Sequence, residues 1–303
     1  MASTIEGFEK IRVPGDGIEL SVHVGGSGKP LVLLHGYPQN HMCWARVAPE
    51  FAKYFQVLIP DLRGYGDSDA PQDDEQHEVY SKRQMGKDVA AMLAHFGLSS
   101  AHVLGHDRGG RVAYRLALDE PDLVTKLGII EIVPTADFWA SWNADLAIKA
   151  YHWTFLAQPS PLPERMINAD PVGYMDWTLG AWTLGNSLSI FPAASLASYR
   201  AQAADPVRIA AMCADYRAGA TFDRKLDEED RAAGRRITAP LHFLWARGGF
   251  PAQTGDPAGF WRNWADQVTD ESCESGHFVM EENPKAVTEA FLPFFQAQGG
   301  HSP

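Results

Sequence analysis

Short apolar runs alternate with helical patterns along most of the chain. Helical periods at 80–97 and 111–121 lie between runs that have the length and composition of strands covered on both faces of a parallel sheet. The runs, each ended by Gly, Asp or Pro, are PLVLLHG (30–36), FQVLIPD (55–61), AHVLGHD (101–107), KLGIIEIVP (126–134) and PLHFLWA (240–246). This alternation predicts βαβ units, and therefore an α/β fold with a mostly parallel sheet flanked by helices.

Two regions depart from the alternation. Residues 8–26, FEKIRVPGDGIELSVHVGG, carry two alternating stretches around PGDG, which predicts an antiparallel hairpin. From 136 to 236 no strand-like run occurs, and this region holds five of the nine tryptophans, Trp139, Trp142, Trp153, Trp177 and Trp182. We therefore expect a helical cap at 136–236, inserted into a core made of residues 1–135 and 237–303 that closes with a C-terminal helix.

Composition excludes several classes of protein. The net charge is −12 and no Lys/Arg-rich stretch occurs, which argues against nucleic-acid binding. No apolar run approaches the length of about 18 residues that a membrane span needs, and no secretory signal pattern begins the chain, so we expect a cytoplasmic protein without membrane contact. Three scattered cysteines, Cys43, Cys213 and Cys273, predict neither a disulfide framework nor a metal site.

The segment VLGHDRGGRVAY at 103–114 predicts a sharp turn from strand to helix with Asp107 at its corner. A nucleophile held on such a turn needs small residues two positions before and after it, and Gly105 and Gly109 fit. Alone, this pattern is equally typical of an aspartate that caps a helix. Three other motifs agree with the turn: HGYP at 35–38, DLRGYGDSD at 61–69, and SGHF at 275–278, which places His277 late in the chain. Together they predict the α/β-hydrolase fold.

These motifs resemble α/β hydrolases with an aspartate nucleophile, namely haloalkane dehalogenases, soluble epoxide hydrolases and fluoroacetate (haloacetate) dehalogenases, and the resemblance covers nearly the whole chain. It implies that Asp107 attacks an sp³ carbon and forms an ester, which water activated by His277 then hydrolyses. The backbone N–H groups of Tyr37 and Arg108 would stabilise the oxyanion. No cofactor and no metal are implied, and the resemblance suggests a homodimer.

Arg108 follows the proposed nucleophile where haloalkane dehalogenases and epoxide hydrolases usually carry tryptophan, and Arg111 lies one turn further along the helix. Residues at i and i+3 share a helix face, and the positive end of the helix dipole lies there too. Guanidinium groups bind carboxylates in a bidentate manner. Arg108 and Arg111 therefore predict a small anionic substrate that carries a carboxylate.

The resemblance to fluoroacetate dehalogenases extends into the cap. His152, Trp153 and Tyr216 match the positions at which those enzymes place N–H and O–H donors around the departing halide. Donors fixed in place stabilise negative charge as it develops on the leaving group. Aromatic residues in a Trp-rich cap are also typical of simple packing, so the assignment depends on the combination of the three residues.

One residue departs from the family pattern. The acid that orients the histidine is usually an aspartate, whereas GIIEIVPT at 128–135 places Glu131 there. A glutamate can accept the same hydrogen bond from Nδ1, but its additional methylene has to be accommodated by a shift of the loop or of the ring. We expect Glu131 to complete the triad with Asp107 and His277.

The sequence therefore predicts a hydrolase of small 2-haloacids, with conversion of fluoroacetate to glycolate and fluoride as the leading reaction. An epoxide hydrolase is the first alternative, in which cap tyrosines such as Tyr151, Tyr174, Tyr199 or Tyr216 would protonate the epoxide oxygen. Arg108 argues against it, because a neutral epoxide gains nothing from a pair of guanidinium groups. The second alternative is a non-catalytic protein that binds a small acid.

Overall fold

A single eight-stranded sheet forms the centre of the protein, in a computed structural model that describes residues 4–297. The strand order is β1-β2-β4-β3-β5-β6-β7-β8. The pairs β1/β2 and β2/β4 are antiparallel, and the other neighbours are parallel. The strands are β1 (Glu9–Pro14), β2 (Glu19–Gly26), β3 (Lys29–Leu34), β4 (Phe55–Pro60), β5 (Ala101–His106), β6 (Val124–Ile130), β7 (Leu241–Ala246) and β8 (Val268–Cys273).

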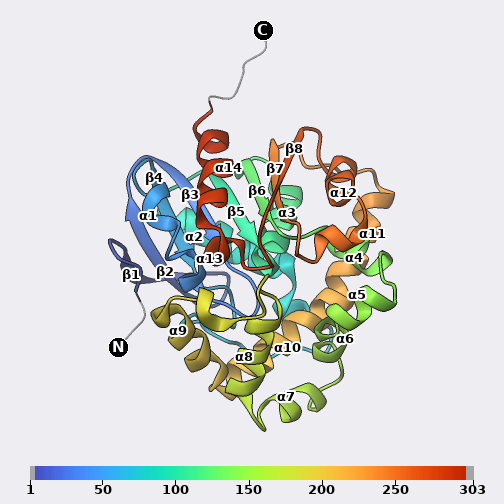
Figure 1. The fold of residues 1–303 in the computed structure, drawn as a ribbon. Helices are drawn as coiled ribbons and strands as arrows, with labels where there is room; N and C mark the ends of the chain where they lie inside the picture. Colours follow the sequence, from blue (N-terminus) through green and yellow to red (C-terminus); the bar gives the residue numbers. More distant parts are fainter. Residues whose placement is uncertain (1–3, 298–303) are drawn as a thin grey trace.

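Helices cover both faces of this sheet. The short helix α1 (Ala48–Phe51) and the C-terminal helix α14 (Pro284–Gln296) pack together, and α2 (Lys82–His95) packs with α3 (Arg108–Asp119). Figure 1 shows α14 in front of the sheet and α3 behind it. The remaining elements of this part are η1 (His41–Trp44), η2 (Glu78–Tyr80), η4 (Pro251–Thr254), α12 (Pro257–Trp264) and α13 (Val279–Glu282).

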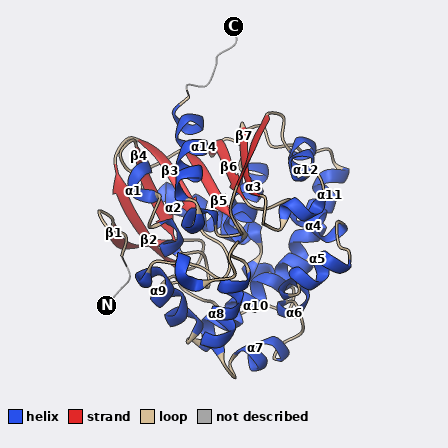
Figure 2. Cartoon of the chain, in the orientation of Figure 1, coloured by secondary structure: helices blue, strands red, loops and turns tan. Residues whose placement is uncertain are grey.

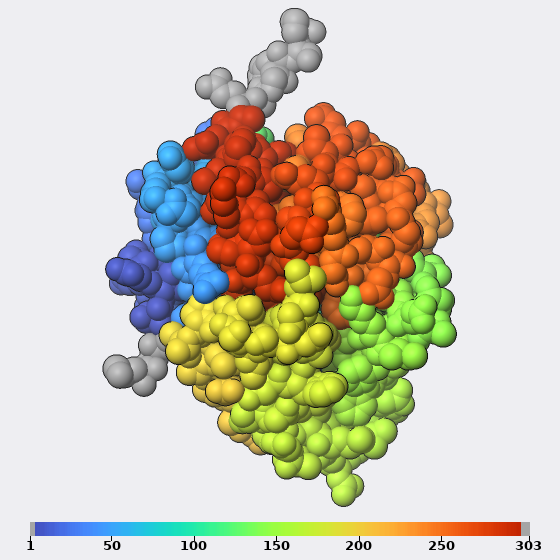
Figure 3. All heavy atoms as spheres, viewed as in Figure 1, coloured from blue at the N-terminus to red at the C-terminus, as the bar shows by residue number. Residues whose placement is uncertain are grey.

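The chain between β6 and β7, all of which the structure describes, contains helices and loops and no strand. Figures 1 and 2 show most of these helices gathered below the sheet, and Figure 3 shows their surface forming the lower part of the molecule. The helices are α4 (Thr135–Ala140), α5 (Ala144–Lys149), α6 (His152–Leu156), α7 (Leu162–Ile167), α8 (Pro171–Ala181), η3 (Leu188–Ile190), α9 (Ala193–Ala203), α10 (Pro206–Ala220) and α11 (Phe222–Ala232). We refer to residues 136–236 as the cap.

The α/β-hydrolase fold predicted from the sequence is confirmed, and so is the hairpin at 8–26, which β1 and β2 form. The pattern analysis missed β8. Its residues VTDESC are polar at the four central positions, and Thr269, Asp270 and Glu271 are exposed, because β8 is an edge strand with a neighbour on one side only. A hydrophobic run therefore does not mark it.

The structure also bears on membrane-spanning helices, metal-binding groups and disulfides. Within residues 4–297 no helix has the length and apolar character needed to cross a membrane. In the same range, no group of three or more His, Cys, Asp or Glu side chains could hold a metal ion. The side chains of Cys43, Cys213 and Cys273 are buried and are not joined in disulfides.

Candidate active site

Asp107 lies at the corner between β5 and α3, and its backbone has a positive φ of 48°. This conformation is unfavourable for a residue with a side chain, so the surrounding structure has to impose it. The turn is tight: a Cβ on Gly105 would lie 2.4 Å from the carbonyl oxygen of Gly109, and a Cβ on Gly109 would lie 2.3 Å from that of Leu34. Both glycines are therefore required sterically, and the turn holds the Asp107 carboxylate at the carboxyl end of β5.

The loop after β3 contacts this carboxylate directly. The backbone N–H of Tyr37 donates to Asp107 Oδ1 at 2.7 Å. Gly36 makes the approach possible, because a Cβ there would lie 2.4 Å from the Cβ of Asp107. The N–H of Arg108, at the first position of α3, has no acceptor within its own helix. These are the two N–H groups that the sequence analysis assigned to an oxyanion hole.

His277 lies between the other two proposed triad members without a hydrogen bond from its ring. Nε2 is 3.8 Å from Asp107 Oδ2, and Nδ1 is 3.9 Å from Glu131 Oε1. Neither ring nitrogen has a hydrogen-bond partner in the structure. Burial holds the pKa of His277 well below its usual value, so the ring is neutral at pH 7 and able to accept a proton. The structure thus brings the three predicted residues together, at distances that have to shorten for catalysis.

Glu131 follows β6, and its carboxylate is bound by the last residue of β7 and by the loop that follows this strand. Oε2 accepts the N–H of Ala246 at 2.7 Å, and Oε1 accepts the N–H of Phe250 at 2.8 Å. Space for the longer side chain comes from Gly249, where a Cβ would lie 1.5 Å from Glu131 Oε1. Burial raises the pKa of Glu131 to about 8, although the two N–H donors favour its charged form.

Arg111 is a buried cation without an anionic partner. Its side chain is 2% exposed and lines the same cavity as Asp107 and His277. Nη1 donates to the carbonyl of Val133 and to Thr135 Oγ1, both at 3.0 Å, whereas Nε has no partner. Within the described chain Arg111 forms no ion pair, and burial lowers its pKa. It therefore remains available to an anion that enters the cavity.

Arg108 is situated differently, because Asp215 of α10 binds it inside the protein. Nε donates to Asp215 Oδ1 at 3.0 Å, and Nη2 donates to the Asp215 carbonyl at 2.6 Å. Lys82 and Tyr65 also donate to this carboxylate. Burial alone would lower the pKa of Arg108, but the ion pair raises it. Arg108 is not among the residues that line the cavity, and only Nη1 is left without a partner. Its role as a substrate ligand stays a prediction.

The three proposed halide donors gather on the cap side of Asp107. His152 and Trp153 begin α6 and line the cavity, and Tyr216 of α10 packs against both, with ring centroids 5.6 and 6.0 Å away. The Tyr216 hydroxyl and His152 Nδ1 are buried without hydrogen-bond partners. Burial raises the pKa of Tyr216 and lowers that of His152, so both are neutral at pH 7. Both can therefore donate to a leaving group.

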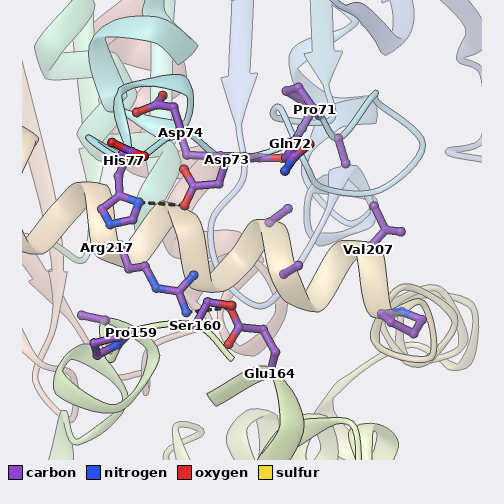
Figure 4. Close-up of a pocket in the computed structure, with 17 residues that line it drawn as sticks. Pro71, Gln72, Asp73, Asp74, His77, Pro159, Ser160, Glu164, Val207 and Arg217 are labelled. Carbon is purple, nitrogen blue, oxygen red and sulfur yellow. Dashed lines mark hydrogen bonds and ion pairs between the residues drawn. The ribbon is translucent and has the colours of Figure 1, made fainter. Parts of the chain in front are cut away.

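The cavity at Asp107 is small, with a volume of about 10 Å³, which is room for about one water molecule. A far wider groove, of about 840 Å³, lies elsewhere. Figure 4 shows residues that line it, among them Pro71, Asp73, His77, Glu164 and Arg217. Helix α10 contributes Arg217 to this groove and Asp215 to the buried pair with Arg108. Any substrate larger than water therefore has to displace side chains or move the cap to reach Asp107.

Sequence reasoning missed two residues that shape this site. Asp215 directly precedes Tyr216 in the sequence, but nothing local indicates that it pairs with a residue 107 positions earlier. Gly249 belongs to the pair GG after β7, and such a pair is typical of an ordinary loop. Its steric relation to Glu131 becomes visible only once both strands are placed side by side.

Comparisons with known proteins agree with this geometry. Residues 29–284 match the family model described as the alpha/beta hydrolase fold. A fluoroacetate dehalogenase from Burkholderia sp. is 38% identical over 289 residues, 95% of this chain and 94% of that protein. A soluble epoxide hydrolase from Corynebacterium sp. is 33% identical, over 92% and 94% of the two chains. The solved structure of an alpha/beta hydrolase from Nostoc sp. superposes with a TM-score of 0.94 at 39% identity, covering 97% of this chain and 100% of the other.

The chain belongs to the alpha/beta hydrolase fold family, and it is a hydrolase. The resemblance to fluoroacetate dehalogenases stated from the sequence is confirmed as a similarity over nearly the whole chain. Epoxide hydrolases are similar over almost the same length, so these similarities leave the substrate to be argued from the site.

Proposed function

We propose that this protein hydrolyses small 2-haloacids, with fluoroacetate to glycolate as the leading reaction, through an ester on Asp107. The observation that carries the proposal is Arg111, a buried guanidinium without a carboxylate partner in the same cavity as Asp107 and His277. A buried charge without a partner is costly, and a substrate carboxylate would supply that partner. The neutral substrate of an epoxide hydrolase would leave this cation unpaired.

In the first step, the Asp107 carboxylate displaces halide from the carbon next to the substrate carboxylate. Oδ1 is already bound by the Tyr37 N–H at 2.7 Å, so Oδ2 is the oxygen free to attack. The new bond joins Oδ2 to carbon, and the electron pair of the carbon–halogen bond leaves with the halide. His152, Trp153 and Tyr216 would donate hydrogen bonds to the halide as its charge develops.

In the second step, His277 takes a proton from water, and the resulting hydroxide attacks Cγ of the Asp107 ester. The negative charge then develops on Oδ1, to which the Tyr37 N–H already donates, and the Arg108 N–H has no acceptor within its own helix. When the Cγ–Oδ2 bond breaks, the imidazolium of His277 returns its proton to Oδ2, which leaves as the hydroxyl of the 2-hydroxy acid. The proton of the added hydroxyl passes to solvent, which regenerates the Asp107 carboxylate. Glu131 would stabilise the imidazolium that His277 becomes.

A second candidate, an epoxide hydrolase, is favoured by the unpartnered hydroxyl of Tyr216 and by the similarity to the Corynebacterium enzyme. The hydroxyl and the neutral His152 could together donate to the oxygen of an opening epoxide. Asp107, His277 and Glu131 would keep the same roles, because both reactions pass through an alkyl ester.

Halide release from fluoro-, chloro- and bromoacetate, measured beside diol formation from styrene oxide, separates these reactions. We expect halide from the haloacetates and no turnover of the epoxide. Diol formation without halide release would overturn the proposal in favour of the epoxide hydrolase. Tight binding of haloacetate with no product from either substrate would identify a non-catalytic acid-binding protein instead.

A further inference from the structure

The ring of His277 has no hydrogen bond of its own, so other contacts have to determine its position. Both ring nitrogens lack hydrogen-bond partners among the described residues. The ring packs against those of His106, Phe250 and Trp182, with centroids at 4.7, 5.0 and 5.5 Å. Packing of the ring restricts the side-chain rotation of His277, but it does not determine the position of the backbone to which the ring is attached. The backbone of residues 276–278 therefore decides how far Nε2 lies from Asp107.

That backbone is bound from two sides at His277 itself. Its N–H donates to the carbonyl of Trp182 in the cap at 2.8 Å. Its carbonyl accepts a hydrogen bond from Nε2 of His106, the residue directly before Asp107, at 2.8 Å. The proposed base is thus connected both to the cap and to the turn that carries the proposed nucleophile.

Glu282, at the end of α13, binds the residues on either side of His277. Oε2 accepts the N–H of Gly276 at 3.0 Å, and Oε1 accepts the N–H of Phe278 at 3.1 Å. Oε2 also accepts the N–H of Leu184 in the cap at 2.8 Å. One carboxylate therefore joins the loop of the base to the cap through three charged hydrogen bonds.

Gly276 packs tightly against the cap segment that Glu282 binds. A Cβ there would lie 2.5 Å from the backbone nitrogen of Leu184 and 2.5 Å from the carbonyl oxygen of Trp182. The loop of the base and the cap segment 182–184 are therefore in direct backbone contact where the Glu282 carboxylate binds both.

We propose that Glu282 is a positioning residue that sets the place of His277 through the backbone on both sides of it and couples that place to the cap. The inference rests on the proposed function, in which His277 acts only in hydrolysis of the ester. Losing Glu282 should then slow the second step while the attack by Asp107 proceeds. Loss of folded protein would instead reduce both steps equally.

The test compares Glu282→Ala and Glu282→Gln with Glu289→Gln, a substitution of an exposed glutamate of α14 that forms an ion pair with Lys285. Both Glu282 variants remove the same negative charge, but glutamine keeps one acceptor oxygen and alanine keeps none. A difference in rate between them therefore measures the contribution of that oxygen. With chloroacetate, we expect Glu282→Ala to slow ester hydrolysis by about 10- to 100-fold, as for other supporting residues. Glu282→Gln should lie between Glu282→Ala and wild type, and Glu289→Gln should match wild type.

Chloride release, hydroxy-acid release and the mass of the Asp107 peptide are followed together in a single turnover. Ester accumulation in Glu282→Ala at a normal rate of chloride release supports the inference. Equal slowing of both steps, or no slowing, overturns it. His277→Asn is run in parallel with chloroacetate and styrene oxide. If that variant accumulates no ester from either substrate, the proposed function itself fails. This control therefore distinguishes failure of the proposed function from failure of the inference about Glu282.

Discussion

The two arginines at the start of α3 have different surroundings, although the sequence suggests the same task for both. Asp215 neutralises Arg108, and this pair is fully buried. Arg111 has neutral partners only. Removing Arg108 would leave a buried carboxylate with Lys82 as its nearest cation, which is a cost to folding. Removing Arg111 would break no ion pair among the described residues, but the Asp107 carboxylate would lose the attraction of this cation.

We therefore predict that Arg111→Leu lowers kcat/KM for chloroacetate by about 10- to 100-fold, as expected when a charged hydrogen bond worth roughly 1.5–3 kcal/mol is lost. The melting temperature should not fall by more than a few degrees, because the variant breaks no ion pair among the described residues and removes a charge that burial disfavours. Enzyme kinetics and thermal melting of the same preparation check both parts. Wild-type kinetics would mean that another group holds the substrate carboxylate.

Glu131 leads to a prediction about pH. Its pKa is raised to about 8, so the side chain is protonated below that pH and ionised above it. Only the carboxylate can stabilise the imidazolium, whereas His277, with its lowered pKa, is neutral throughout this range. Ester hydrolysis should therefore accelerate as pH rises through about 8. Single-turnover rates between pH 6.5 and 9 check this, and the rise should vanish in Glu131→Gln. A rise that persists in that variant would contradict the assignment.

Among the secondary-structure elements, those determined by their own local residues were predicted from the sequence. The buried strands consist mainly of apolar residues, and the turn at Asp107 needs glycines at fixed spacing, so both were visible in the sequence. Strand β8 was not, because a polar edge strand has no such run. The partner of Arg108 was not predictable either, since Asp215 reaches it only when α10 of the cap packs against α3.

The loop after β7 shows how an element accommodates a longer side chain. Gly249 leaves the space that Glu131 fills. We predict that Gly249→Ala displaces the Glu131 carboxylate and slows ester hydrolysis, while halide release stays near the wild-type rate. Adding Glu131→Asp, which is one methylene shorter, should restore part of the lost rate.

Single-turnover kinetics of Gly249→Ala, Glu131→Asp and the double variant measure this coupling. Gly185→Ala is the matched control, because a Cβ there meets no atom within 4 Å. Additive effects of Gly249→Ala and Glu131→Asp would show that the two positions do not share the space, contrary to the structure.

In the whole molecule, the cap covers the site closely, and the cavity at Asp107 has a volume of about 10 Å³. The wider groove of Figure 4 lies along α10 and is not lined by Asp107. Turnover therefore depends on a movement of the cap or of the lining side chains, and substrates that need less space require less movement.

We accordingly predict that kcat/KM falls steadily from chloroacetate to 2-chloropropionate to 2-chlorobutyrate, because each added carbon has to be placed between Asp107 and the aromatic side chains of the cap. Chloride release from the three acids under identical conditions measures the trend. A preference for the largest acid would contradict a closed, tight site.

The proposed mechanism transfers one carboxylate oxygen of Asp107 to the product, and isotope labelling can follow that oxygen. One turnover of chloroacetate, with enzyme in excess, is carried out in water labelled with heavy oxygen. Hydroxide attacks Cγ of the ester, so heavy oxygen should appear in the peptide that contains Asp107, and the first glycolate released should carry unlabelled oxygen from the enzyme. Labelled glycolate with an unlabelled Asp107 peptide would mean that water attacks the substrate carbon directly, and would contradict the account.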